Sequence, residues 1–267
     1  MNRSLEIICI GNELLIGKTL NTNENWLAKR ATALGISVRR ITTVGDEVDG
    51  IGEAVEETLR RRPRFILITG GLGPTHDDKT LEGVAEALGR KVAVNEVALE
   101  MVKGKYEDYF REGRMEKFKL TPARVKMAAL PEGAEPLPNP VGTAPGVLLE
   151  VEGSYLIALP GVPSEMKAIF EGSVAPLILM EAGEMGFFEE SIHVDGIMES
   201  ALAPLIDEAM RENPYVYIKS HPKGEEGRSH IEIHLSTSAE DPQEAQRRLE
   251  KAAGTIHELI EDFSRRE

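Results

Sequence analysis

Three strand-like segments, each followed by a loop and a helical stretch, constrain the fold of this chain most strongly. They are LEIICI (5–10), ISVRRITTV (36–44) and FILIT (65–69). Apolar residues at helical spacing follow each of them, the last time in LEGVAEAL before Gly89. Strands that alternate with helices form a parallel sheet covered on both faces. The sequence therefore predicts an α/β fold with a mostly parallel sheet.

The rest of the chain divides into the end of this domain and a smaller module. PLPNPVGTAPGVLLEV and SYLIALPGVPSEM supply two further strands, and a helix follows from Ser164 to about Met180. A change of composition at 181–191 marks a linker. Beyond it the pattern is strand, helix, strand, strand, helix, which is typical of a small α+β domain. We expect domains at 1–183 and 187–267.

Composition excludes several classes of protein. The 267 residues include 31 Lys+Arg and 45 Asp+Glu, a net charge of −14. A protein that neutralises nucleic-acid phosphates shows the opposite bias, so nucleic acid is not expected as a partner. No apolar run reaches the roughly 18–20 residues that span a bilayer, and the N-terminus lacks a signal-peptide core. We expect a cytoplasmic protein without membrane contact, in which the single Cys9 is a core residue.

The strongest local signal is the segment FILITGGLGPTHDDKT. Its strand leads into Gly70, Gly71 and Gly73, and we expect the next helix to begin near Asp77 or Asp78. Backbone N–H groups at such a turn can bind an anion, and glycine lets the anion approach. The segment is neither a P-loop nor a GxGxxG fingerprint. A tight strand-to-helix connection is the alternative interpretation.

Acidic residues follow three of the predicted strands. Asp77 and Asp78 are either first-turn helix caps or oxygen ligands for Mg²⁺. Asp46 and Glu13 come after the other two strands. Ligands of open α/β sheets bind at the carboxyl ends of the strands, so the convergence of these loops favours a functional site.

Two proline- and glycine-rich loops fit the same edge of the sheet. They are NPVGTAPG (139–146) and LPGVPSEM (159–166), and they are either ordinary turns or rigid walls of a nucleotide or pterin pocket. Their candidate binding residues are Asn139, Gly142, Gly161 and Pro163.

The second domain holds five of the six histidines. They are His193, His221, His230, His234 and His257. His230 and His234 share one side of a strand, which permits metal binding, but partly exposed structural histidines are the favoured interpretation. The GEEG segment (224–227) has the GxxG form of RNA-binding KH domains, but it is acidic and lies in a predicted hairpin, so RNA binding is not expected.

Five motifs together carry a resemblance to a known family. GNELLIGKTLNTN, TVGDE, TGGLGPTHDDKT, NPVGTAPG and LPGVPSEM, in this order, resemble the CinA family (competence/damage-inducible protein A). The resemblance implies a molybdopterin-binding-like three-layer first domain and a KH-like second domain. Full-length bacterial members carry a further nicotinamide mononucleotide deamidase-like domain, and deamidation is not expected here.

The resemblance also implies roles for particular residues. It places Gly70, Gly71, Gly73 and Thr75 around the phosphate of a ligand, and it makes Asp78 and Asp46 the functional carboxylates. One departure is Met127, where a glutamine is usual in the family.

The leading hypothesis from this resemblance is a metal-dependent pyrophosphohydrolase acting on ADP-ribose or a related nucleotide diphosphate sugar. Asp78, with Asp46 or Asp77, would hold Mg²⁺ or another divalent metal such as Co²⁺, and Glu13 would position water or ribose. The alternatives are a non-catalytic molybdopterin- or nucleotide-binding protein and an adenylyl-transfer enzyme of molybdenum-cofactor type. We also expect a homodimer, held by an exposed face of the second domain's sheet or by an edge strand such as SHIEIHLS.

Overall fold

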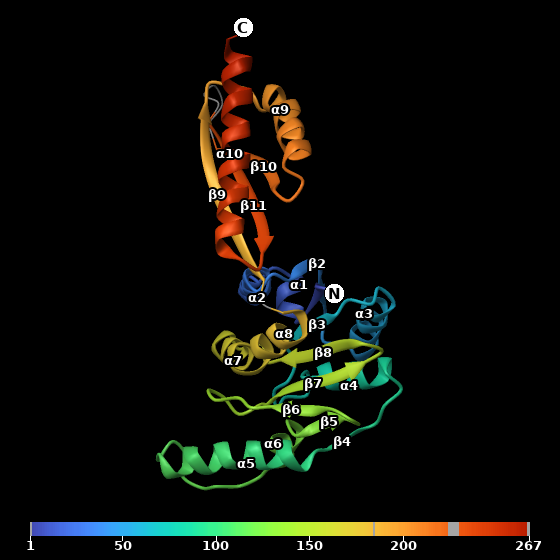
Figure 1. Ribbon diagram of the computed structural model, residues 1–267. Coiled ribbons are helices and arrows are strands. Elements are labelled where there is room, and N and C mark those ends of the chain that lie inside the picture. Colours follow the sequence, from blue (N-terminus) through green and yellow to red (C-terminus); the bar gives the residue numbers. More distant parts are fainter. Residues whose placement is uncertain (1, 184, 224–229, 266–267) are drawn as a thin grey trace. The chain divides into compact units, whose positions relative to one another are not determined.

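The computed structural model describes residues 2–183, 185–223 and 230–265, which form two compact units (Figure 1). The first unit comprises Met1–Thr32 and Ile36–Gly183, and the second comprises Ala33–Gly35 and Glu184–Glu267. Each unit has its own hydrophobic core. All the site residues predicted from the sequence belong to the first unit.

A six-stranded sheet forms the centre of the first unit. In spatial order its strands are β2 (Ser37–Val44), β1 (Ser4–Ile10), β3 (Phe65–Thr69), β8 (Ser154–Leu159), β7 (Gly146–Val151) and β6 (Glu135–Leu137). The first four are parallel, whereas β7 and β6 pair in the antiparallel sense. A separate antiparallel pair is formed by β4 (Val92–Val94) and β5 (Ala129–Pro131). The predicted α/β fold with a mostly parallel sheet is confirmed.

Burial explains why the central strands were recognisable in the sequence. Every residue of β3 is buried, and so are six of the seven residues of β1. Parallel strands covered on both faces read as continuous apolar runs. By contrast, β2 lies at the edge of the sheet and has no buried residue, which accounts for its polar alternation.

Helices cover both faces of this sheet. The helices of the first unit are α1 (Asn12–Leu15), α2 (Thr22–Ala33), α3 (Val48–Arg60), α4 (Thr80–Ala87), α5 (Glu96–Arg111), α6 (Pro122–Lys126), α7 (Pro163–Ile169), the π-helical turn η1 (Phe170–Val174) and α8 (Ala175–Ala182). Ile51 of α3 and Val84 of α4 share a core cluster with Ile8 of β1. Cys9 points to the other face of β1, where its thiol lies 3.9 Å from Glu24 Oε2 of α2. Alternate residues of one strand thus pack against different helix layers.

The helices α6 and α4 begin in different ways. Thr121 caps α6 by accepting the N–H of Arg124, and Pro122 is the first helical residue. The expected start of the next helix near Asp77 or Asp78 is wrong, because α4 begins at Thr80. The two carboxylates instead accept hydrogen bonds from Thr75, which stabilises a turn in the loop rather than the first turn of the helix.

Burial also settles the character of Cys9. The side chain is fully buried, and this burial raises the pKa of its thiol to about 11, because the charged thiolate is disfavoured away from water. Cys9 is therefore the inert core residue that the sequence predicts. In the part of the chain that the structure describes, no helix is long and apolar enough to cross a membrane.

The second unit is a three-stranded antiparallel sheet with two helices. Its elements are β9 (Gly186–Asp195), α9 (Glu199–Glu212), β10 (Tyr217–Pro222), β11 (His230–Ala239) and α10 (Pro242–Ser264). The predicted order of strands and helices is confirmed. The suggestion that SHIEIHLS forms an edge strand is wrong, because β11 lies between β10 and β9. The GEEG segment (224–227) lies outside the described residues.

A buried ion pair links the sheet of the first unit to α3. The Glu6 side chain on β1 is only 5% exposed, and the Arg61 guanidinium donates to both of its carboxylate oxygens over 2.7–3.0 Å. Arg61 also donates to the Thr58 hydroxyl at 3.0 Å. The carboxylate of Glu6 is thus buried with a two-pronged partner, which is how proteins accommodate a buried charge.

Removing the guanidinium should destabilise the first unit strongly. We expect Arg61→Met to lower the free energy of unfolding by about 3–5 kcal/mol, because it leaves the Glu6 carboxylate buried and unpaired. Arg60→Met is the matched control, since Arg60 reaches Glu56 only at 4.0 Å with both side chains exposed, and its cost should stay below about 1 kcal/mol. Urea unfolding of both variants tests this, and equal losses would contradict it.

Candidate functional site

Four segments meet at the carboxyl edge of the parallel strands. They follow β1, β2, β3 and β8 and comprise residues 11–21, 45–47, 70–79 and 160–162. Backbone hydrogen bonds tie them to neighbouring strands. The Gly11 N–H donates to the Val44 carbonyl, and the Gly70 N–H donates to the Leu159 carbonyl, each at 3.1 Å. Loops far apart in the sequence are therefore held side by side.

The glycine loop after β3 needs glycine at two positions for steric reasons. A Cβ at Gly70 would lie 2.2 Å from the carbonyl oxygen of Ile10, and one at Gly71 would lie 2.3 Å from Thr80 Oγ1. Both residues also have positive φ, of 111° and 62°. The buried Thr80 hydroxyl donates to the Gly70 carbonyl at 2.7 Å. The start of α4 thus holds the loop in place.

This loop presents unpaired backbone donors. Among the described residues, the N–H groups of Gly71, Leu72 and Gly73 donate to no protein acceptor. Consecutive free N–H groups in a turn form a concave site for an anion. The loop therefore has the chemistry that the sequence predicts for phosphate binding.

Thr75 and two aspartates close the far end of the loop. Asp78 Oδ2 accepts the N–H of Thr75 at 2.7 Å and its hydroxyl at 2.6 Å, and Thr75 Oγ1 also contacts Asp77 Oδ1. The hydrogen bond from Thr75 lowers the pKa of Asp77 below its usual value. The ammonium of Lys126 donates to the carbonyls of Thr75 and Asp78. A cation brought from α6 thus fixes the loop's conformation.

Asp46 and Glu13 lie at the neighbouring strand ends. Asp46 Oδ2 accepts the N–H of Asn12 at 2.8 Å, so the segment after β2 holds the segment after β1. Glu13 follows directly in α1, and its carboxylate folds over Gly11, where a Cβ would lie 2.6 Å from Oε1. These two predicted site residues are therefore close in the fold through Asn12.

A cavity of about 130 Å³ opens between these segments. Four predicted site residues line it together: Glu13, Gly70, Gly161 and Pro163. Asn23 of α2 lies in its wall and donates to Thr69 Oγ1 at 3.2 Å and to the Gly161 carbonyl at 2.8 Å. Its Oδ1 is buried and has no hydrogen-bond partner among the described residues. An unpaired buried acceptor in a cavity wall is a position where a ligand donor fits.

Other predicted residues lie around two separate hollows. Gly71, Gly73 and Asp78 line a smaller one of about 30 Å³, together with Lys126 and Met127. Asn139 borders another of about 250 Å³.

Asn139 holds its own loop together. Its amide donates to the Ala144 carbonyl and to Glu165 Oε2, and its carbonyl accepts the N–H groups of Val141 and Gly142. The Asn139 amide then has no hydrogen-bonding capacity left for a ligand. Gly142 allows the Glu165 carboxylate to pack closely, since a Cβ there would lie 2.0 Å from it. This loop is therefore built as a rigid wall.

The predicted metal ligands do not yet form a metal centre. In the described residues, no three His, Cys, Asp or Glu side chains are arranged to hold an ion. Asp77 and Asp78 are engaged by Thr75, and Asp46 is engaged by Asn12. Asp77 and Asp78 therefore stabilise their own loop, whereas Asp46 joins the segment after β2 to the segment after β1.

Three residues of this edge were missed by the sequence reasoning. Asn23, Lys126 and Glu165 each join a helix to a loop that is distant in the sequence. Asn23 is the second asparagine of the NTN triplet. The position of this triplet between a predicted loop and a predicted helix was the only local sign that Asn23 belongs to the site.

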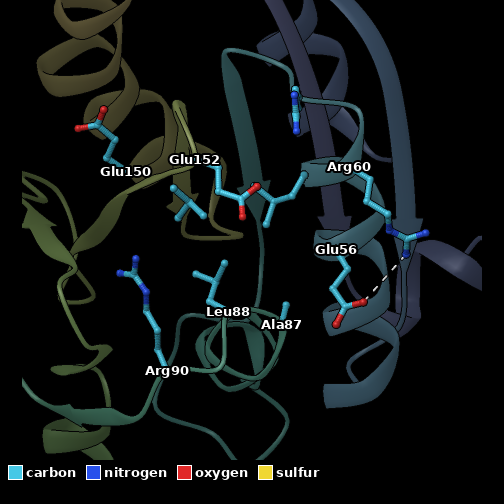
Figure 2. A pocket seen from close by; sticks show the side chains of 10 residues that line it. Glu56, Arg60, Ala87, Leu88, Arg90, Glu150 and Glu152 are labelled. Atoms are coloured by element: carbon cyan, nitrogen blue, oxygen red, sulfur yellow. Dashed lines mark ion pairs between the residues drawn. The ribbon is translucent and has the colours of Figure 1, made fainter.

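A larger cavity lies elsewhere in the first unit. It measures about 600 Å³, and Figure 2 shows acidic and basic side chains from several elements around it. It lies at the amino edge of the strands, since Arg62 precedes β3 and Glu152 precedes β8. Arg60 and Glu56 form an ion pair at its side. None of the predicted site residues lines it.

A comparison of two glycine-to-alanine variants separates two costs of a side chain at position 71: the backbone strain of a positive φ and the collision with Thr80. Gly71→Ala and Gly89→Ala both place a side chain at positive φ, near 60°, but a Cβ at Gly89 meets no atom within 4 Å. We expect Gly89→Ala to cost about 1 kcal/mol of stability, and Gly71→Ala to cost about 1–3 kcal/mol more, because it displaces the Thr80 hydroxyl. Chemical unfolding measures both, and equal costs would show that the loop adapts freely.

Known proteins resemble the chain over most of its length. A protein of Pyrobaculum aerophilum is 48% identical over 255 residues, covering 95% of this chain and 93% of that protein. A protein of Aeropyrum pernix is 49% identical over 258 residues, with coverage of 95% and 93%. The crystal structure of the protein CinA from Thermoplasma acidophilum is 40% identical, with a TM-score of 0.60, and the match covers 66% of this chain and 98% of that one.

These similarities confirm that the first unit has the CinA-like, molybdopterin-binding-type fold. The resemblance of the second unit to a KH domain stays a prediction. The family match covers the strands and loops that form the carboxyl edge. Residues 6–180 match the family described as "Probable molybdopterin binding domain", and the chain belongs to that family.

Proposed function

We propose that the first unit binds a phosphorylated pterin or nucleotide at the carboxyl edge of its parallel strands. The observation that carries this proposal is the cavity of about 130 Å³ beside the glycine loop, whose wall includes Asn23, a residue with a buried Oδ1 that has no partner among the described residues. Membership of the molybdopterin-binding family supports a ligand of this class. The proposal assigns one part of the site to the phosphate and another to the ring.

The glycine loop binds the phosphate. Its three unpaired N–H groups, at Gly71, Leu72 and Gly73, supply donors without side-chain bulk. Lys126 holds the end of the loop through two carbonyls, so the donors are in place before the ligand arrives. Preorganised donors lose little entropy when they bind an anion.

The cavity beside the loop binds the ring. Asn23 Oδ1 accepts an N–H of the heterocycle, and the apolar side chains of Leu14 and Leu20 border the same space. A few placed polar groups in a mainly apolar wall are typical of sites for small organic ligands. Pterins and adenine both offer ring or amino N–H donors, so both belong to the proposed ligand class.

Removing the Asn23 amide should weaken binding of the ring. We expect Asn23→Ala to reduce the affinity for neopterin phosphate or AMP by about tenfold, the effect of losing one buried hydrogen bond. Asn95→Ala is the matched control, because Asn95 caps α5 and lies outside this cavity. Isothermal titration calorimetry measures both, with thermal unfolding to verify the fold. No binding of either probe by the unmodified protein would refute the proposal.

A second candidate function is hydrolysis of ADP-ribose to AMP and ribose 5-phosphate, as the sequence resemblance implies. The carboxylates of Glu13, Asp46 and Asp78 favour this hydrolysis, because a site that only binds phosphate does not require them. Asp46 and Asp78 each keep one oxygen free of hydrogen bonds among the described residues. Their lack of convergence on one point does not fit a preformed metal centre, so no catalytic step is assigned to a metal.

Chelation separates the two candidates. We expect AMP to bind equally well with EDTA and with Mg²⁺, within twofold. We also expect ADP-ribose incubated with Mg²⁺ or Co²⁺ to yield no AMP, because no set of His, Cys, Asp or Glu side chains in the described part of the chain is arranged for a metal. Chromatography of the reaction mixture detects the product. AMP formation that Asp78→Asn abolishes and Asp49→Asn leaves intact would instead identify the hydrolase; Asp49 lies in the first turn of α3.

The remaining expectations from the sequence stay predictions. Adenylyl transfer rests on the fold alone. The homodimer and the cytoplasmic location have no support in the geometry of the site.

A further inference from the structure

Two helical segments begin at the candidate site and contact each other at three levels. The first is α2, which has Asn23 of the cavity wall in its first turn. The second is α7, which begins at Pro163 of the same wall and continues into η1. The three contacts, here called the helix ladder, are Asn23 with Gly161, Trp26 with Phe170, and Arg30 with Glu171.

The first level of the helix ladder lies in the site itself. The NH₂ group of Asn23 donates to the Gly161 carbonyl at 2.8 Å and to Thr69 Oγ1 at 3.2 Å. These two hydrogen bonds determine which half of the amide is occupied, since Oδ1 has no partner among the described residues. The proposed contact with the ligand ring therefore depends on the orientation of one side-chain amide.

The second level is an aromatic contact one turn further along α2. The Trp26 ring meets the fully buried Phe170 ring edge to face, with centroids 5.3 Å apart and an angle of 87°. The Lys167 ammonium of α7 lies 5.5 Å from the centroid of the same Trp26 ring. Both contacts are directional, so a rotation of α2 about its axis weakens them.

The third level is an ion pair between α2 and η1. Arg30 Nε and Nη2 donate to the two carboxylate oxygens of Glu171 at 2.5 and 2.8 Å. Its guanidinium thereby lowers the pKa of the Glu171 carboxyl. Arg30 lies seven residues after Asn23, about 10 Å along the helix, and residues at this spacing share one face. The ion pair thus holds the same face of α2 that carries the amide.

We propose that Arg30 and Glu171 are positioning residues for the ligand site, which act on the Asn23 amide through the helix ladder. A rotation of α2 carries the amide away from Gly161, and the third level resists this rotation with two charge-assisted hydrogen bonds. The expected effect on binding rests on the proposed function, whereas the expected effect on the amide does not.

The first test follows the Asn23 amide in the ligand-free full chain by ¹H–¹⁵N NMR, with Asn23→Ala identifying its signal. We expect Glu171→Arg to shift this signal and to speed its exchange with water, because like charges then meet at the third level. The charge exchange Arg30→Glu/Glu171→Arg should return the signal to its original position. Glu181→Arg is the matched control, since Glu181 pairs with Arg64 outside the helix ladder, and it should leave the signal unchanged.

The second test measures AMP binding by calorimetry. We expect Glu171→Arg to weaken binding about fivefold, the effect of one weakened hydrogen bond. The charge-exchanged variant and Glu181→Arg should bind within twofold of the unmodified chain, although Glu181→Arg also loses an ion pair. This pattern separates positioning from a general loss of stability.

The outcome is decisive with or without AMP binding. Far-ultraviolet circular dichroism verifies that each variant is folded, and Glu171→Gln replaces Glu171→Arg if the reversed charge prevents folding. An Asn23 signal that is unchanged at a broken third level, that shifts equally in Glu181→Arg, or that the charge exchange does not restore would overturn the proposal. If the unmodified chain binds no AMP, the proposed function fails, and the amide signal alone decides on the positioning role.

Discussion

The parallel pairing of β1 with β2 and β3, extended by β3 with β8, is the constraint on which the rest of the first unit depends. Parallel strands place all their carboxyl ends at one edge, whatever the distance between them in the sequence. Glu13, Asp46, Gly70 and Gly161 become neighbours for this reason alone. The same pairing fixes the opposite edge, where the ends of α3 and α4 meet the turn between β7 and β8 around a charged cavity.

Much of this fold was predictable because burial on both faces leaves a strong pattern in the sequence. FILIT and LEIICI are continuous apolar runs, and both are inner strands. Two local errors have physical causes. The α4 helix begins later than expected because Thr75 draws the aspartates into a loop, a contact that helix-capping rules do not include. SHIEIHLS was suggested as an edge strand because alternation reveals which side is buried, but not how many neighbours a strand has.

The candidate site was predictable to a smaller extent. Glycine carries information by itself, since Gly70 and Gly71 are positions where a side chain would collide with the backbone or with Thr80. The roles of Asn23 and Lys126 are not readable from their local sequence, because the residues that they contact are distant. Those of Asn23 lie 46 and 138 residues away, and those of Lys126 lie 51 and 48 residues away. Asn139 illustrates the converse. Its motif suggested ligand binding, but the structure commits its whole amide to the loop.

The unpaired oxygen of Asn23 has a consequence for how this residue is retained. A buried acceptor without a partner costs the free protein about 1–3 kcal/mol, whereas an apolar residue of similar shape avoids that cost. The NH₂ group of the same amide offsets part of this cost. It donates hydrogen bonds to Thr69 of β3 and to the Gly161 carbonyl in the segment after β8. Leucine at this position would remove the unpaired oxygen together with both of these hydrogen bonds, so the asparagine joins two strand ends at the cost of one unsatisfied acceptor.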